Sequence, residues 1–242
     1  MPKYVKCLIC GGTCYYSKDV KSMPCMFCGD SFYTNFVCEN DHYVCDECQM
    51  GRALEMITAT CEESKKKEAI ALAFQMMTNK WLKIDGPEYP YLVAATLLTA
   101  YKNRGYSTKT ANRKFPSILD EAKKRALKIA MNPREYWGCS GEAIGCGIFA
   151  SLIPKVTPAA KSERGAANLL TSIVLEQISI YGGPRCGKRE SLIAIFVASQ
   201  FAEEHWNMPL TDFEGAECIF YKDNPECTKS ECPFFPIIDK EK

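Results

Sequence analysis

The chain has 242 residues, of which 47% are hydrophobic and 24% are charged, so it can bury a core and is not disordered throughout. Its 30 Lys and Arg residues against 29 Asp and Glu residues leave a formal net charge of +1. This balance disfavours nucleic acid and an anionic membrane surface as partners. No apolar run reaches the roughly 18 residues that a membrane-spanning helix requires.

Fifteen cysteines are the unusual feature of the composition. No apolar signal segment follows Met1, so we expect the chain to stay in the reducing cytoplasm, where disulfides are rare. Eight of the cysteines lie within residues 1–48, a turn-rich stretch too short to close a core without a metal. The sequence therefore predicts a zinc-binding module at 1–50 and a cysteine-rich helical domain at 51–242.

Four ligand pairs follow one another in the first module. Each pair has the short spacing that presents two side chains on one side of a turn, as a tetrahedral Zn²⁺ requires. The pairs are Cys7 with Cys10, Cys25 with Cys28, Cys38 with His42, and Cys45 with Cys48. Eight ligands fill two closed zinc sites, and the histidine favours zinc over an iron–sulfur cluster. Cys14 remains as a spare thiol.

The spacing allows two ways of distributing these four ligand pairs over two zinc ions. In a cross-brace, the pairs that begin at Cys25 and Cys45 share one ion, and those that begin at Cys7 and Cys38 share the other. In a sequential arrangement, the first two pairs share one ion and the last two the other. The run from Cys38 to Cys48 resembles part of a RING or treble-clef finger. The order of the pairs departs from the ubiquitin-ligase pattern, so we carry over no ligase activity.

Beyond residue 50 the apolar periodicity predicts a mainly α fold with about seven helices. The expected helices span residues 50–62, 65–81, 91–101, 116–130, 140–153, 162–181 and 187–206. Asn132-Pro133 should stop the fourth, and Gly182-Gly183 should end the sixth. Residues 207–242 contain four prolines and read as loop.

Two cysteines of the helical domain lie in a glycine-rich segment around a predicted helix start. Cys139 precedes Ser140, a good helix cap, and should lie at the positive end of the helix. Cys146 follows two turns later on roughly the same face. Glu142 is the best candidate for a catalytic base or ligand beside them. Four glycines between 138 and 147 cost ~1 kcal/mol each in a helix, which indicates that a bulky group or another backbone approaches closely.

A third cysteine, Cys186, lies in a tight turn that enters the last long helix. Arg185, Lys188 and Arg189 surround it. These cations and the helix N-terminus favour the thiolate, and they can also bind an anion such as phosphate, sulfide or a carboxylate. Cys139 and Cys186 are therefore the leading candidates for catalytic thiols.

Cys61 lies inside a predicted helix, where we expect it to be a packing residue. The last three cysteines, Cys218, Cys227 and Cys232, lie in the proline-rich tail. Together with Cys139, Cys146 and Cys186 they form a candidate iron–sulfur site. In one version, the thiols at 139, 146 and 186 hold a 4Fe–4S cluster with one open iron that acts as a Lewis acid, and the tail completes its ligation or holds a second cluster. The alternatives are redox thiol chemistry and buried, unreactive thiols.

The motifs Gly138-Cys139 to Phe149, Gly182 to Arg189, and Cys232 to Phe235 resemble a cysteine-rich family of anaerobic bacteria and archaea that is known as a domain of unknown function. The resemblance spans about residues 85–236 and implies no reaction. Members often carry a second cysteine where this chain has Gly187. The segment 138–145 is also similar to the cluster-binding loop of iron–sulfur serine dehydratases and cysteine desulfidases.

These patterns lead to a primary hypothesis and an alternative. The primary one is a metalloprotein of anaerobic metabolism, with a zinc module and an iron–sulfur cluster for sulfur handling, lyase-type activation of a small anionic or sulfur-containing substrate, or electron transfer. The alternative is a non-catalytic adaptor whose zinc fingers bind a protein or RNA. It draws on the complete finger ligands and on residues 102–128, where nine Lys and Arg face two acids.

Overall fold

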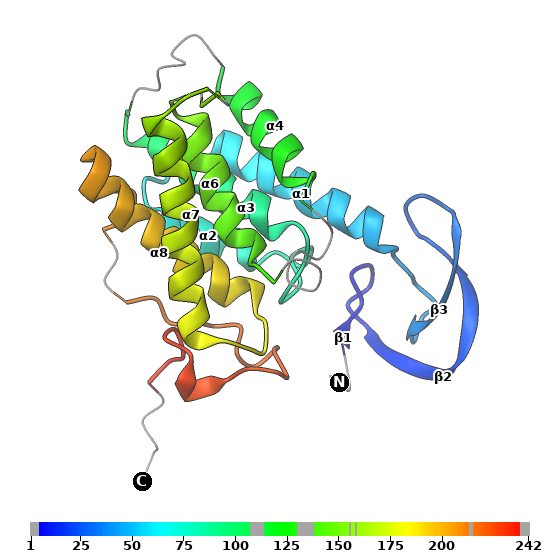
Figure 1. Cartoon of the computed structure of the whole chain (residues 1–242). Helices are drawn as coiled ribbons and strands as arrows, with labels where there is room; N and C mark the ends of the chain where they lie inside the picture. Colours follow the sequence, from blue (N-terminus) through cyan, green and yellow to red (C-terminus); the bar gives the residue numbers. More distant parts are fainter. Residues whose placement is uncertain are drawn as a thin grey trace. The chain divides into compact units, whose positions relative to one another are not determined.

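The computed structural model describes residues 5–106, 114–129, 138–154, 156–157, 159–212 and 215–237. The chain divides into two compact units, residues 1–53 and residues 54–242. Among the described residues there are seven α-helices and one small sheet, so the predicted mainly α class is confirmed (Figure 1).

The first unit is built on an antiparallel sheet of β1 (Val5–Lys6), β2 (Thr13–Pro24) and β3 (Ser31–Cys38), in the order β1-β2-β3. Its register places Cys14 of β2 opposite Cys38 of β3. The buried cluster of this sheet consists of Cys7, Cys14 and Cys38, with Ile9 and Phe36 packed against it. Because so little apolar surface is buried, packing alone cannot hold these strands together.

The helix α1 (Asp46–Glu63) begins in the first unit and continues into the second. The second unit then contains α2 (Ala69–Met77), α3 (Tyr89–Asn103), α4 (Phe115–Ala126), α6 (Gly141–Leu152), α7 (Ser162–Tyr181), α8 (Gly187–Trp206) and the short 3₁₀ helix η1 (Lys229–Glu231). The predicted ranges 162–181 and 187–206 match α7 and α8. The predicted helix 65–81 is shorter at both ends in the structure, because Glu68 is still extended before α2 begins and the chain leaves the helix at Thr78. The predicted stop at Asn132-Pro133 lies outside the described residues.

The helix α3 forms the centre of the second unit. It is buried from Tyr89 to Tyr101 and packs against α2, α4, α6 and α8. Gly145 of α6 allows the closest approach, since a Cβ atom there would lie 2.5 Å from the carbonyl oxygen of Pro90. Gly145 thus makes room for another backbone, one of the two explanations that the sequence offered.

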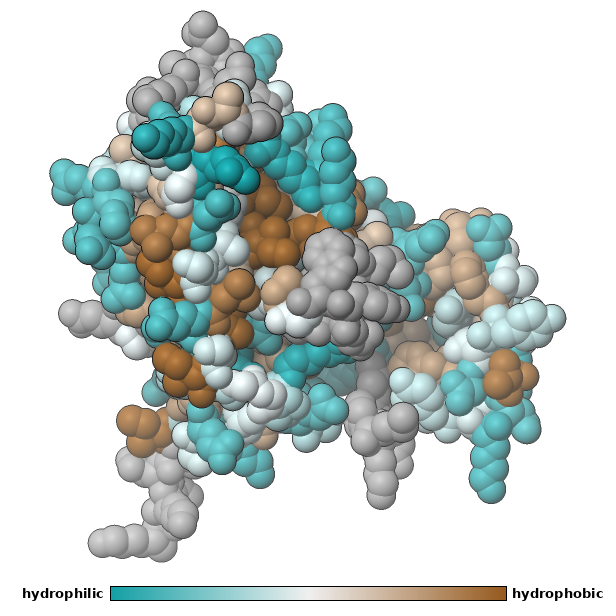
Figure 2. All heavy atoms as spheres, viewed as in Figure 1, coloured by the Kyte–Doolittle hydropathy of each residue, from teal (hydrophilic) through white to brown (hydrophobic). Residues whose placement is uncertain are grey.

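Hydrophobic side chains also reach the surface of the second unit. Figure 2 shows such side chains along α7, where Leu169 and Ile180 are 45% and 66% exposed. None of the helices in the described ranges combines the length and the apolar character needed to cross a membrane.

Candidate metal centres

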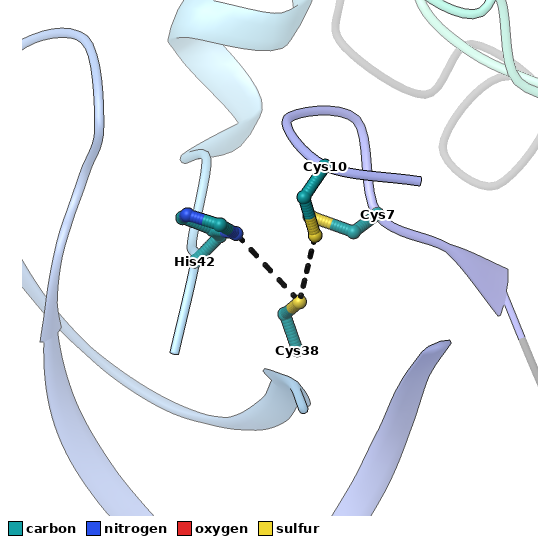
Figure 3. Close-up of side chains that lie close together, drawn as sticks. All are labelled: Cys7, Cys10, Cys38 and His42. Atoms are coloured by element: carbon teal, nitrogen blue, oxygen red, sulfur yellow. Dashed lines mark hydrogen bonds between the residues drawn. The ribbon is translucent and has the colours of Figure 1, made fainter. Parts of the chain in front are cut away.

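The first ligand group joins two loops of the small sheet. Cys7 and Cys10 lie in the turn between β1 and β2, Cys38 ends β3, and His42 follows in the next loop. Figure 3 shows their side chains pointing toward one another. The Sγ atom of Cys38 lies 3.7 Å from that of Cys10 and 3.9 Å from His42 Nδ1. All four ligand atoms lie within 4.8 Å of one another.

The second group lies at the other end of β2 and β3. Cys25 and Cys28 occupy the turn between these strands, whereas Cys45 precedes α1 and Cys48 lies in its first turn. Their four sulfurs also lie within 4.8 Å of one another. The ligands are therefore grouped as in the cross-brace arrangement and not as in the sequential one. Either group can hold a metal ion, and no disulfide links the cysteines of either.

Backbone amides face the sulfurs of these groups. The N–H groups of Ile9, Gly12 and Asn40 donate to the sulfurs of Cys7, Cys10 and Cys38, each over 3.4 Å. Such donors favour the thiolate that binds a metal. The hydrogen bond from the Asn40 side chain is the largest of the effects that lower the pKa of Cys10 to about 6.

Cys14, the spare thiol of this module, belongs to neither group. It is 6% exposed, and burial, together with the neighbouring thiols of Cys7 and Cys38, raises its pKa to about 12. A thiol of this kind stays protonated at neutral pH and acts as a small apolar side chain.

Four cysteines of the helical unit surround one small pocket. Cys186 contributes from the turn before α8, and the other three come from the tail: Cys218, Cys227 and Cys232. Apolar side chains, among them Leu192 and Phe220, complete the wall. The tail packs here against α2, since Phe220 stacks on Phe74 with 5.9 Å between the ring centroids. Cysteines more than 30 positions apart in the sequence thus line the same pocket.

Each of these four sulfurs faces a backbone amide two or three residues further along the chain. Lys229 N donates to Cys227 Sγ over 3.4 Å. Burial raises the pKa of the other three thiols, and amides oppose that rise: Arg189 at Cys186, Phe220 and Tyr221 at Cys218, and Phe234 and Phe235 at Cys232. The same local geometry occurs at Cys7, Cys10 and Cys38 in the first unit.

The sulfurs around the pocket stand farther apart than those of the first unit. Four thiolates on one zinc ion, with Zn–S bonds of about 2.3 Å, lie roughly 3.8 Å from one another. In the described part of the chain, no three of the four pocket sulfurs fall within 4.8 Å of one another.

Two buried cations of α8, Lys188 and Arg189, line the same pocket. Lys188 Nζ donates to the carbonyl oxygen of Met77 over 2.6 Å and lies 3.9 Å from the centre of the Phe220 ring. Burial lowers the pKa of Lys188 to about 8. Arg185, by contrast, forms an ion pair with Asp85 at 2.9 Å and is not among the described residues that line the pocket.

The structure does not bring Cys139 or Cys146 to this pocket. Cys146 is completely buried in α6, where its thiol donates to the carbonyl oxygen of Ala194 over 3.4 Å. Cys139 lies just before α6 and is partly exposed. Glu142 is 1% exposed and accepts a hydrogen bond of 2.7 Å from Ser140 Oγ. Of the helical-domain cysteines that the sequence singles out, Cys186 and the three tail residues share one location.

The sequence pattern of the family of unknown function DUF5714 matches residues 57–235. The match takes in the four pocket cysteines and leaves out both ligand groups of the first unit. No curated protein and no solved structure matched the chain.

Proposed function

The chain belongs to DUF5714, a family of unknown function, and we propose that it is an iron–sulfur protein of the electron-transfer class whose first module is folded by two zinc ions. The observation that carries this proposal is the convergence of four cysteines, Cys186, Cys218, Cys227 and Cys232, on one pocket.

The spacing of the pocket sulfurs supports a cluster over a single ion. A cubane cluster binds each cysteine through a different iron atom, so its ligands stand farther apart than those of zinc. Four thiolates on such a cluster leave a net negative charge, which Lys188 and Arg189 offset from the pocket wall. The backbone amides that face the sulfurs are a recognised means of tuning cluster potentials.

The number of ligands supports electron transfer among the chemistries that the sequence left open. Lyase-type activation and sulfur handling require an iron with a free coordination position. Four cysteine ligands occupy all four irons of a cubane cluster, so the bound centre would supply reversible one-electron storage. Cys186 and the tail cysteines would hold it, and the apolar wall with Leu192 and Phe220 would limit the access of water. The partners would be one-electron donor and acceptor proteins of anaerobic metabolism in the cytoplasm.

Anaerobic purification tests this function directly. We expect iron, acid-labile sulfide and the broad visible absorbance of a thiolate-ligated cluster, bleached when dithionite supplies one electron. Cys227→Ser should lose most of the iron. Cys61→Ser is the matched control, because Cys61 is fully buried near Met76 Sδ and far in sequence from the pocket cysteines. Wild-type protein free of iron and sulfide after anaerobic purification would contradict the proposal.

Zinc is the metal we propose for the first module. The set Cys7, Cys10, Cys38 and His42 contains an imidazole, and its ligand atoms, like those of the second group, are spaced for one small tetrahedral ion. Closed sites of this kind provide folding energy and no open coordination position.

A second candidate function, that of an adaptor, draws on the surface of the first module. The side chains of Tyr16, Val20 and Tyr33 on β2 and β3 are 53%, 63% and 84% exposed. Aromatic groups exposed on a zinc-folded sheet are typical contacts for a protein partner. An interaction abolished by Tyr33→Ala and unchanged by Cys186→Ser would favour this function, and the opposite result would favour the redox role.

A further inference from the structure

Arg189 has a donor that the protein does not satisfy. The residue is 5% exposed and lines the cysteine pocket, and its Nε atom is buried without a hydrogen-bond partner among the described residues. Leaving a buried donor of a charged group unsatisfied destabilises the folded protein. Such a group in a folded protein calls for a specific explanation, and a bound ligand is one.

Both terminal nitrogens of Arg189 form hydrogen bonds, and these contacts fix the side chain in place. Nη2 donates to the carbonyl oxygens of Gly182 and Pro184 over 2.8 and 2.9 Å. Nη1 lies 3.4 Å from Thr228 Oγ1. The guanidinium therefore links the turn that carries Cys186 to the tail segment that carries Cys227. Since the plane is held by these contacts, the direction of the Nε–H bond is also set.

Arg189 lines the pocket together with four cysteines, Cys186, Cys218, Cys227 and Cys232. Its positive charge thus lies beside cysteines of two different segments, the turn before α8 and the tail. A planar guanidinium is well suited to fixed, directional hydrogen bonds to anions.

We propose that the Nε–H group of Arg189 donates a hydrogen bond to a sulfur atom of the iron–sulfur centre held by the four pocket cysteines, so that Arg189 assembles the site and sets its reduction potential. This inference rests on the proposed function. Adding an electron makes the centre more negative, and a cation in contact with it stabilises the reduced form.

The test compares three variants purified without oxygen: Arg189→Gln, Arg189→Lys and Arg125→Gln. Arg125 is the matched control, because it lies on α4, where its Nε donates to Glu121 over 2.8 Å and its Nη1 to Ser151. The readouts are iron per chain and the midpoint potential from a dye-mediated titration. We expect Arg189→Gln to shift the potential to more negative values, Arg189→Lys to restore part of the shift, and Arg125→Gln to match the wild type.

The outcomes separate this inference from the function on which it rests. Wild-type protein without iron and sulfide contradicts the proposed function itself. A wild-type cluster with the same iron content and the same potential in both Arg189 variants overturns the role of Arg189 alone. If Arg189→Gln retains too little iron to titrate, Arg189→Lys decides: a shifted potential or a lowered iron content supports the contact, and wild-type values for both overturn it.

Discussion

Gly145 of α6 lies against the carbonyl oxygen of Pro90 in α3, so closely that a Cβ atom at position 145 would stand 2.5 Å from that oxygen. The contact joins the central helix to the helix that carries Cys146. The backbone atoms at this contact cannot move apart unless the two helices themselves shift.

We therefore expect Gly145→Ala to destabilise the helical unit. Overpacking typically costs about 1–3 kcal/mol, more than the roughly 1 kcal/mol that alanine gains over glycine in a helix. The matched control is Gly165→Ala in α7, where an added Cβ would meet nothing within 4 Å, so that the gain remains. Thermal unfolding followed by circular dichroism should show a lower midpoint for the first variant and an unchanged or higher one for the second. A midpoint for Gly145→Ala equal to that of the wild type would contradict the packing described here.

Removal of the proposed zinc ions should unfold the first module selectively. The buried cluster of its sheet contains three cysteines and little apolar surface, so the metal supplies most of its folding free energy. We expect a strong chelator, or the substitution Cys25→Ser, to broaden the NMR signals of residues in β2 and β3 while the helical circular dichroism signal largely remains. Cys14→Ala should keep two zinc ions per chain, measured by elemental analysis. One zinc ion in that variant would make Cys14 a ligand.

Cys146 should prove to be a packing residue. Its side chain is fully buried, and its thiol donates a hydrogen bond to the carbonyl oxygen of Ala194, which does not line the pocket. We expect Cys146→Ala to retain the iron and the visible spectrum of the wild type while its melting temperature falls, because a buried sulfur is lost from the core. Loss of iron from this variant, with the fold intact by circular dichroism, would restore the version of the site in which residues 139, 146 and 186 share one cluster.

Glu88 should make the stability of the helical unit depend on pH. It is 4% exposed, and burial raises its pKa from 4.5 to about 7. The folded state therefore holds a proton that the unfolded chain loses above about pH 4.5, so this contribution to stability is complete below that pH and is lost as pH rises through 7. The full effect is at most about 3 kcal/mol, taking 1.36 kcal/mol for each pKa unit.

The pH effect can be isolated by comparing urea unfolding of the wild type and Glu88→Gln at several pH values between 5 and 8.5. Glutamine keeps the size of the side chain and does not titrate. We expect the difference in unfolding free energy between the two proteins to favour Glu88→Gln increasingly as pH rises. A difference that stays constant across this range would show that Glu88 does not titrate between the two states.

The helices were the most predictable part of the fold. The ranges 162–181 and 187–206 follow from apolar periodicity bounded by Gly182-Gly183 and by the turn around Cys186, and these signals are local in sequence. The end of α2 was less predictable. Apolar residues continue to Trp81 and Leu82, but the chain turns after Met77, where Asn79 Oδ1 accepts a hydrogen bond from the amide of Trp81.

Which candidate metal ligands group together could be determined only from the sheet in the structure. Local spacing identifies each pair, because two thiols on one turn are neighbours in any fold. Which pairs share an ion depends on strand register: pairing of Cys14 with Cys38 carries the β1–β2 turn to the end of β3. The sequence of the first 48 residues shows no clear alternation from which this register could be read.

The cysteine pocket could not be predicted from the sequence either, because its residues come from segments far apart in the chain. The sequence indicates that Cys186 lies in an unusual turn and that three cysteines follow in the tail, but no period connects the two segments. Their meeting depends on tertiary contacts such as the stack of Phe220 on Phe74 and the link from Arg189 to Thr228. The glycine-rich segment with Cys139 and Cys146 gave the stronger local signal, and the structure explains Gly145 and Gly147 by helix packing.

The order of the pocket sulfurs along the chain has a consequence for biosynthesis. Cys186 leaves the ribosome more than 30 residues before Cys218, and α8 lies between them. A nascent polypeptide can thus pack its helices while the pocket still lacks three of its four sulfurs. Insertion of the proposed cluster would have to wait until the segment through Cys232 has emerged from the ribosome. The cluster would therefore be inserted later than the helices fold.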